Sequence, residues 1–265
     1  MIDFHTHAFP DALAPRAIPS LAENMGIAPK HDGTVSGLLA LMEQCGISRS
    51  VVLNIATNPS QENAVNSFAI RLVGHERLIP FGSVFPGSAT WREQLERLKN
   101  AGVRGVKLHP EYQNFDLDCP EALAVYRRCG ELGLIVQFHA GEDAAFPPPV
   151  HTGAARINRV CESCPDTVFV AAHFGGYNMW EDAAQNLTYH DNLYLDTSMT
   201  CTAARPEKEH VRRILETVGV EHILLGSDSP WEFPGDSVEG VRGLGLSNAD
   251  TARILSGNAV RLLDL

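Results

Sequence analysis

The chain has 265 residues, of which 44% are apolar and 20% are charged, so it can bury a sizeable core and is neither disordered nor collagen-like in composition. Its formal net charge of −11, with no sizeable cluster of Lys and Arg, argues against binding to nucleic acid, which needs a basic surface. No apolar run reaches the roughly 18 residues that a membrane-spanning helix requires.

Short β-branched or apolar runs predict eight strands, with room for a helix after each one. The predicted strands are 1–5, 50–55, 78–84, 103–109, 133–139, 167–173, 192–197 and 222–227. The predicted helices include Val35 to Cys45, Glu62 to Gly74, Trp91 to Ala101, Glu121 to Leu132, Ala154 to Cys164, Glu207 to Val218 and a closing helix from Ser247 to Leu263. Strict alternation of strand and helix is typical of parallel pairing, and eight such units indicate closure. We therefore expect an α/β fold, a (β/α)8 TIM barrel that occupies residues 1–265 as a single domain.

Cysteine usage indicates a reducing compartment. Six cysteines are spread through a chain that is large enough to need no disulfides, as is typical of cytosolic proteins. Cys161 and Cys164 form an isolated CxxC, and we expect two thiols on a helix face because no second pair completes a zinc site. The richest motif starts at Asp3, so removal of a cleavable leader would destroy it. We expect a cytoplasmic protein.

Polar residues end five of the predicted strands. They are Asp3-Phe4-His5-Thr6-His7, Lys107-Leu108-His109, Gln137-Phe138-His139, Ala172-His173 and Gly226-Ser227-Asp228. In a (β/α)8 barrel the carboxyl ends of all strands open on the same mouth, where active sites lie. We therefore expect these side chains to meet there.

Three histidines and a carboxylate among them predict a metal site. His5 and His7 are two residues apart on a strand, so their Cα atoms lie about 6.6 Å apart on one face, close enough to share an ion. An isolated HxH is weak evidence, but His139, His173 and Asp228 end other strands and face the same mouth. Buried without partners, such groups would cost several kcal/mol, and a divalent ion supplies the partner. His139 is predicted to be the third ligand or else a hydrogen-bonded pocket histidine, and Asp228 to be a ligand or else a helix cap.

The motifs resemble those of the amidohydrolase superfamily, in particular the branch that includes aminocarboxymuconate semialdehyde decarboxylase. The segments that carry the resemblance are Asp3-Phe4-His5-Thr6-His7, Gly105-Val106-Lys107-Leu108-His109-Pro110, Phe138-His139-Ala140-Gly141, Ala172-His173-Phe174-Gly175-Gly176 and Gly226-Ser227-Asp228-Ser229-Pro230-Trp231. The resemblance covers nearly the whole chain. It implies one divalent ion, usually zinc, with the ligands His5, His7, His139 and Asp228. It also implies that His173 binds and polarises water or substrate.

The end of the fourth strand leaves the number of ions open. Other branches of the superfamily place a carboxylated lysine there, which bridges two ions, and this chain has Lys107 followed by His109. The two residues have the same parity, so if His109 faces the mouth, Lys107 lies one layer deeper, which disfavours a bridging role. We expect one ion, with His109 as a substrate-binding residue; a two-metal site and a packing role for both residues remain as alternatives.

Two reactions fit the same ligands. In hydrolysis of an amide, lactone or ester, the ion activates water, Asp228 accepts its proton and passes it to the leaving group, and His173 stabilises the developing charge. The alternative is a metal-dependent decarboxylase, a C–C lyase, of a small carboxylated substrate. That enzyme should carry basic groups at the mouth, and the candidates are few: Arg16, Lys30, His31, His151 and Arg156. The sequence therefore favours a hydrolase; a non-catalytic binding protein is a third alternative, which an open metal site disfavours.

Long predicted mouth loops indicate a closed pocket for a small organic molecule. The loops are 8–33, 110–118, 140–152, 174–182 and 229–236. Aromatic residues in them that could line the pocket are Phe9, Tyr112, Phe146, Tyr177, Trp180, Trp231 and Phe233. We expect His109, His151 and Trp180 to bind substrate. A small molecule, rather than nucleic acid or a membrane, is the expected partner, and the sequence leaves a homodimer open.

Overall fold

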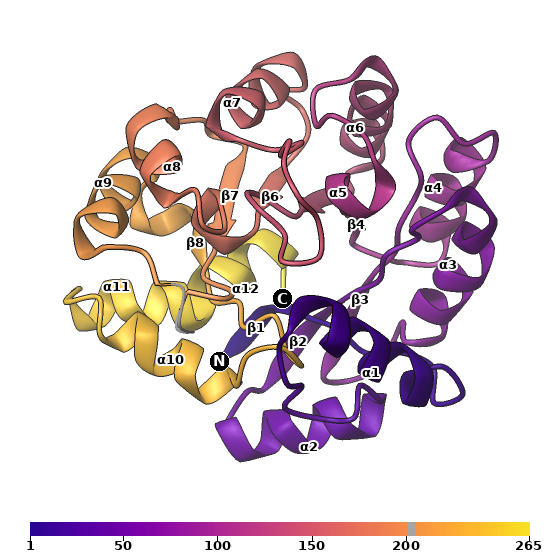
Figure 1. Ribbon diagram of the computed structural model, residues 1–265, viewed down its shortest axis with the longest axis horizontal. Helices are drawn as coiled ribbons and strands as arrows, with labels where there is room; N and C mark the ends of the chain where they lie inside the picture. Colours follow the sequence, from indigo (N-terminus) through magenta and orange to yellow (C-terminus); the bar gives the residue numbers. More distant parts are fainter. Residues whose placement is uncertain (201–204) are drawn as a thin grey trace.

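A computed structural model describes residues 1–200 and 205–265 of the chain, and within these ranges eight parallel strands alternate with helices. The strands are β1 (Ile2–Thr6), β2 (Arg49–Leu53), β3 (Leu78–Phe81), β4 (Gly105–Leu108), β5 (Ile135–Phe138), β6 (Phe169–Ala171), β7 (Leu193–Asp196) and β8 (Ile223–Leu224). The helices are α1 (Ala14–Met25), α2 (Val35–Cys45), α3 (Glu62–Arg71), α4 (Trp91–Asn100), α5 (Pro110–Gln113), α6 (Pro120–Leu132), α7 (Ala154–Ser163), α8 (Trp180–Asn186), α9 (Lys208–Val218), α10 (Pro234–Arg242), α11 (Asn248–Ala252) and α12 (Asn258–Leu263). In Figure 1 the strands form the centre and the helices surround them.

The strands close into a barrel, as the sequence predicts. Regular pairing runs through β1-β2-β3 and through β4-β5-β6-β7-β8, and every pair is parallel. Between β3 and β4, Gly82 N donates to Gly105 O at 2.9 Å and Lys107 N donates to Gly82 O at 2.8 Å. Between β8 and β1, Phe4 N donates to Leu225 O at 2.7 Å. These bonds join the two sheets at both seams into a (β/α)8 barrel.

An apolar layer fills the barrel below its mouth. Its buried members are Ile2, Phe4, Val51, Leu53, Phe81, Ile135, Val170, Tyr194 and Leu224, together with Ala259 and Leu263 of α12. Side chains two residues apart on a strand point to the same face. Gln137 lies two residues after Ile135, and Asp196 lies two residues after Tyr194, so a buried polar layer lies above the apolar one. Folding this sequence therefore places polar side chains in a desolvated floor at the carboxyl ends of the strands.

Most helix bounds agree with the sequence to within three residues, but four helices were not predicted. Helix α1 occupies part of the expected loop 8–33; Pro19 argues against a helix there, yet Ile18 and Leu21 keep the apolar spacing of one. Helices α5, α8 and α10 likewise begin within the expected loops 110–118, 174–182 and 229–236. Each of the four follows a strand end, so part of the predicted mouth is helical rather than irregular.

Two further expectations concern the CxxC thiols and the lack of a long apolar helix. Cys161 lies on α7 and Cys164 directly after it, and both are free and buried against the main core. Cys201 lies outside the described residues. Among the helices of the described ranges, none combines the length and apolar character needed to cross a membrane.

A buried carboxylate, that of Asp3, fastens β1 to the end of β8. Asp3 Oδ1 accepts hydrogen bonds from Ser227 N at 3.0 Å and from His5 N at 3.1 Å, and Oδ2 accepts one from Ser227 Oγ at 2.6 Å. Burial raises the pKa of Asp3 to about 7, although the hydrogen bonds from Ser227 and His5 oppose this rise. Asp3 thereby sets the position of His5 on one strand relative to Asp228 at the end of another.

Replacing Asp3 by Ala should lower the free energy of unfolding by about 2–4 kcal/mol, because three donors lose a buried acceptor. Ser227→Ala, which removes one of these donors, should cost about 1 kcal/mol. The measurement is urea unfolding followed by circular dichroism, with the exposed Asp11→Ala as a control close to wild type. Wild-type stability of the Asp3 variant would contradict this role for the carboxylate.

Candidate metal centre

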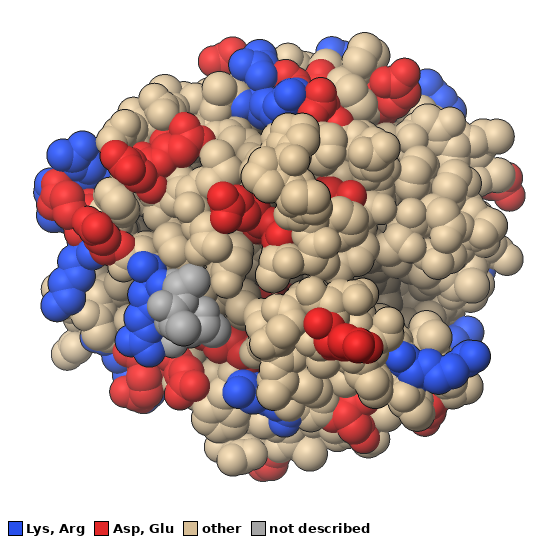
Figure 2. Space-filling model, in the orientation of Figure 1, with Lys and Arg blue, Asp and Glu red and all other residues tan. Residues whose placement is uncertain are grey.

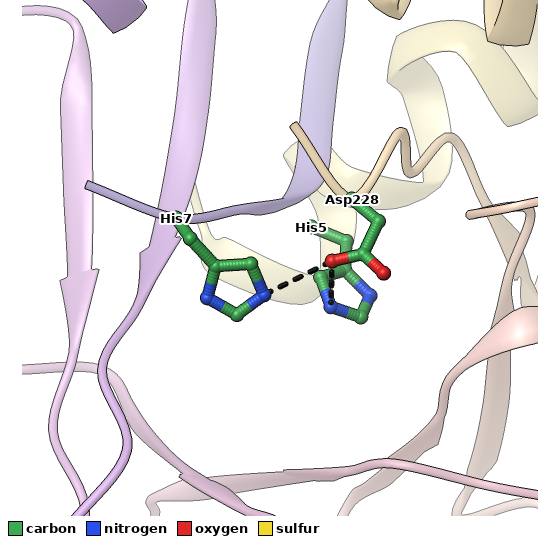
Figure 3. A group of neighbouring side chains, drawn as sticks. All are labelled: His5, His7 and Asp228. Carbon is green, nitrogen blue, oxygen red and sulfur yellow. Dashed lines mark ion pairs between the residues drawn. The ribbon is translucent and has the colours of Figure 1, made fainter. Parts of the chain in front are cut away.

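Two histidine nitrogens meet one carboxylate oxygen at the mouth of the barrel. His5 lies on β1, His7 directly follows β1, and Asp228 follows β8. Asp228 Oδ1 lies 3.3 Å from His5 Nε2 and 3.0 Å from His7 Nε2. Figure 3 shows both imidazoles directed toward this single oxygen. The structure thus brings together three of the four ligands that the sequence predicts.

The second nitrogen of each imidazole, Nδ1, makes a hydrogen bond within the protein. His5 Nδ1 donates to Asp196 Oδ2 at 2.9 Å, and His7 Nδ1 donates to the Leu53 carbonyl at 3.0 Å. A neutral imidazole that carries its proton on Nδ1 has its lone pair on Nε2. Burial, with the nearby Lys107 charge, lowers the pKa of His5 to about 4, which keeps that imidazole neutral. Both Nε2 lone pairs are therefore available at the same point.

This donor set fits a divalent ion. Ligand atoms at about 2.0–2.2 Å from an ion lie roughly 3.0–3.5 Å from one another. The distances from Asp228 Oδ1 to His5 Nε2 and to His7 Nε2 fall in this range. The carboxylate of Asp228 supplies the anionic donor of the set, beside the two imidazole nitrogens. Asp228 also has a left-handed backbone, with φ of 67°, which is costly for a non-glycine residue and turns its side chain toward the histidines.

Asp196, at the end of β7, was missed by the sequence analysis and supports the centre from below. It is fully buried and accepts hydrogen bonds from His5 Nδ1 at 2.9 Å, Gln137 Nε2 at 2.8 Å and His173 N at 3.1 Å. Burial would raise the pKa of Asp196, but the His5 ring and its other donors hold it below its ordinary value. The available signal was a carboxylate followed by Thr197 and Ser198 at the end of an apolar strand.

The structure does not bring His139 into the group of His5, His7 and Asp228. His139 Nε2 lies 2.9 Å from the Glu142 carbonyl, which can only accept, so His139 carries its proton on Nε2. Its other nitrogen, Nδ1, lies 3.1 Å from His173 Nε2. His139 still lines the same cavity, and its role as a third ligand stays a prediction.

His173 reaches the cavity from a strained turn. Its φ is 59°, and that of the next residue, Phe174, is 53°, both in the left-handed region. His173 Nδ1 lies 2.8 Å from Ser198 Oγ, and burial lowers the pKa of this imidazole. The predicted catalytic residues His173 and Asp228 therefore face one cavity, and their catalytic roles stay predictions.

His109 belongs to a second cluster beside the first. His109 Nε2 lies 3.3 Å from Asp143 Oδ2, and its ring stacks on that of His139, with centroids 4.3 Å apart and planes 11° apart. These two histidines and Asp143 have the proximity of metal ligands. Nearly parallel rings, however, direct their lone pairs into separate planes, so one ion cannot lie in both without a ring rotation. We interpret this cluster as a hydrogen-bonded wall of the cavity.

Lys107 lines the floor of the cavity, one layer below His109, and its role as a bridging ligand stays an untested alternative. It precedes His109 by two residues, and its extended side chain bridges the distance of about 6.6 Å between layers. Its Nζ lies 3.4 Å from His5 Nε2, and the residue is 1% exposed. Burial lowers the pKa of Lys107 to about 8, although the carboxylates of Asp196 and Asp228 oppose this.

Two predicted substrate-binding residues lie away from the cavity. His151 Nδ1 lies 3.0 Å from Asp116 Oδ1 near the surface. Trp180 is buried behind His173, where its Nε1 donates to the His173 carbonyl at 2.9 Å. Neither is among the residues that line the cavity in the described part of the chain, whereas Trp231 is.

The cavity has a volume of about 510 Å³, within the range of small-molecule sites. Its floor holds His5, His7, Lys107, His173 and Asp228, and its walls include aromatic residues. The face shown in Figure 2 is hollowed near its middle, mostly among uncharged side chains. A second groove, of about 970 Å³, lies between α9 and α10, and its described lining shares no residue with the cavity. We therefore place the active site in the first cavity.

Comparisons with known proteins bear on the family and on the fold. Residues 2–265 match the profile of the family described as Amidohydrolase, and no curated protein sequence matches. One similar structure is 5-carboxyvanillate decarboxylase from Sphingomonas paucimobilis, with 15% identity and a TM-score of 0.74 over 100% of this chain and 99% of that one. Another is an uncharacterised TIM-barrel protein from Bordetella bronchiseptica, with 22% identity and a TM-score of 0.77 over 100% and 98%. A third is dihydroxybenzoic acid decarboxylase from Polaromonas sp. JS666, with bound manganese and the inhibitor 2-nitroresorcinol, with 16% identity and a TM-score of 0.72 over 100% and 96%. At these identities the likeness shows the barrel fold.

Replacing His5 and His7 together by Ala should remove the bound metal and leave a folded barrel, because both rings lie at the mouth rather than in the apolar layer. Emission spectrometry of the purified protein measures the metal content, and circular dichroism reports the fold. The double variant His75→Ala/His210→Ala removes two histidines from outside the cavity and should keep its metal. Wild-type metal content in the His5/His7 variant would exclude these residues as ligands.

Proposed function

Because the chain belongs to the amidohydrolase family, we propose that it is a metal-dependent enzyme, specifically a decarboxylase that removes CO2 from a small carboxylated substrate. His5, His7 and Asp228 would hold the divalent ion, with zinc or manganese as our candidates. This proposal takes the lyase alternative over the hydrolase that the sequence favoured.

The observation that carries the proposal is the ammonium group of Lys107. It is buried at the floor of the cavity, 3.4 Å from His5 Nε2 and so beside the metal donors. The sequence favoured hydrolysis because it offered few basic groups for the mouth, and Lys107 removes that objection. A buried cation can pair with a substrate carboxylate through charge-assisted hydrogen bonds, whereas a neutral amide, lactone or ester brings no charge to it.

Two of the similar structures support the same reaction class. Both are decarboxylases by name, and one of them contains bound manganese. They share the barrel fold with this chain from end to end at 15% and 16% identity. A similar fold hosts many reactions, so this support is secondary to the chemistry of the cavity floor.

The chain's own residues account for the proton that the reaction needs. The bond between the carboxylate carbon and the substrate carbon breaks, CO2 leaves, and a proton from solvent takes its place on the substrate carbon. A bound ion would withdraw electron density from the substrate oxygens. Asp228, which faces the cavity beside the two histidine donors, would carry the proton to the substrate carbon. Lys107 would hold the carboxylate, and His173 would donate a hydrogen bond to the substrate.

Replacing Asp228 by Asn should keep much of the metal and lower the decarboxylation rate on the order of 10² to 10⁴-fold, because the histidine ligands remain while the proton carrier is lost. Metal content and CO2 release are measured on the same preparation, with the exposed Asp11→Asn as the matched control. Turnover near that of the wild type would transfer the proton-carrying role to another residue, with His173 the next candidate.

The reaction class is tested with metal-loaded protein on two substrate panels, one of aromatic carboxylates and one of amides, lactones and esters. We expect CO2 release from members of the first panel, its loss on treatment with a chelator, and its return when zinc or manganese is restored. Loss of the carboxylate is followed by NMR. Hydrolysis of the second panel without CO2 release from the first would contradict the proposal and restore the hydrolase interpretation.

A further inference from the structure

The cavity has two ends of different chemical character. The ionisable side chains that line it lie at or after the carboxyl ends of the strands, and Lys107 is the one Lys or Arg among its described lining residues. Arg16 and Lys30, which the sequence offered as basic groups at the mouth, are exposed and do not line it. The positive charge available to a substrate is therefore confined to the floor.

One part of the wall above the floor is apolar and comes from two helices, in contrast to the hydrogen-bonded wall of His109, His139 and Asp143. Helix α1 contributes Leu21 and Met25, one turn apart, and α3 contributes Val65 and Phe68, also one turn apart. Trp231 adds an aromatic surface. In these stretches the side chains that meet the cavity carry no charge, so a substrate held at the floor extends its far end into an apolar space.

Two of the neutral polar side chains that line the cavity, Asn54 and Thr57, already use their donors within the protein. Asn54 Nδ2 already donates to the carbonyls of Val52 and Phe81, at 3.3 Å and 2.8 Å. The Thr57 hydroxyl donates to Gln61 Oε1 at 2.9 Å. These groups would have to break existing hydrogen bonds to solvate a second anion.

We propose that the substrate is a monoanion, with its single carboxylate at Lys107 and an uncharged, apolar body between α1 and α3. This inference rests on the proposed function, because it takes the reacting carboxylate as the one charge of the substrate. A second carboxylate at the far end would lose its hydration against apolar walls without a cation to replace it. We therefore expect such a dianion to bind about 100-fold more weakly than its monoanionic counterpart.

The test uses ligands that cannot lose CO2, so it is independent of the reaction. 4-Propylbenzenesulfonate and benzene-1,4-disulfonate share a ring and one sulfonate and differ in the charge at the far end. Titration calorimetry with the zinc-loaded protein should show that the monoanion binds about 100-fold more tightly, with the ratio of the two Kd values correct to about threefold. Equal affinity for the two ligands would overturn the inference.

Two variants test where the charges lie. Val65→Lys places a cation on the apolar wall and should strengthen dianion binding about 10-fold relative to Val65→Met, which has similar length and no charge. Lys107→Met should weaken the binding of both ligands. If Val65→Lys brings no selective gain for the dianion, or if Lys107→Met leaves monoanion binding unchanged, the proposed orientation is wrong.

The outcome also separates this inference from the proposed function. Monoanion preference without CO2 release from the matched carboxylates, 4-propylbenzoate and 4-propyl-2-hydroxybenzoate, supports the charge assignment and counts against the decarboxylase. CO2 release from carboxylates with a second charged group, at rates equal to those of the propyl compounds, supports the decarboxylase and overturns the monoanion inference.

Discussion

The hydrogen bond between His5 Nδ1 and the buried carboxylate of Asp196, 2.9 Å long, determines how the centre is arranged. An acceptor at this position keeps the proton of His5 on Nδ1 and leaves the lone pair of Nε2 facing the cavity. The same carboxylate accepts from Gln137 and from the backbone of His173, so one buried anion aligns three strands. A charge in such a position is tolerated only because its oxygens are satisfied by these donors.

The barrel turns this local arrangement into a cavity with two ends. Apolar residues fill the lower barrel, polar side chains form the floor above them, and helices inserted after the strands supply apolar walls. In the proposed reaction Lys107 and Asp228 would meet the substrate at the floor, and α1 and α3 would enclose the rest of it. Exclusion of water from such a site strengthens the interaction of the floor with a carboxylate, which connects the fold to the proposed reaction.

The sequence predicts this site in part because residue type, strand parity and strand ends can all be read along the chain. The alternation of strands and helices was sufficient for the barrel, and His5 and Asp228 were found from their places at strand ends. Asp196 was missed because a single carboxylate after a strand has no distinctive spacing. The orientation of His139 depends on the Glu142 carbonyl in the following loop, and loop geometry is not encoded in periodicity. Helix α1 was missed because Pro19 lies inside it.

The central claim is that His5, His7 and Asp228 hold a divalent ion at the mouth of this barrel. A crystal of the manganese- or zinc-loaded protein, with anomalous difference density measured at the absorption edge of the metal, tests it most directly. We expect a peak at about 2.0–2.3 Å from His5 Nε2, His7 Nε2 and a carboxylate oxygen of Asp228. A metal peak at the His109 and Asp143 cluster alone, with no density beside His5 and His7, would contradict it.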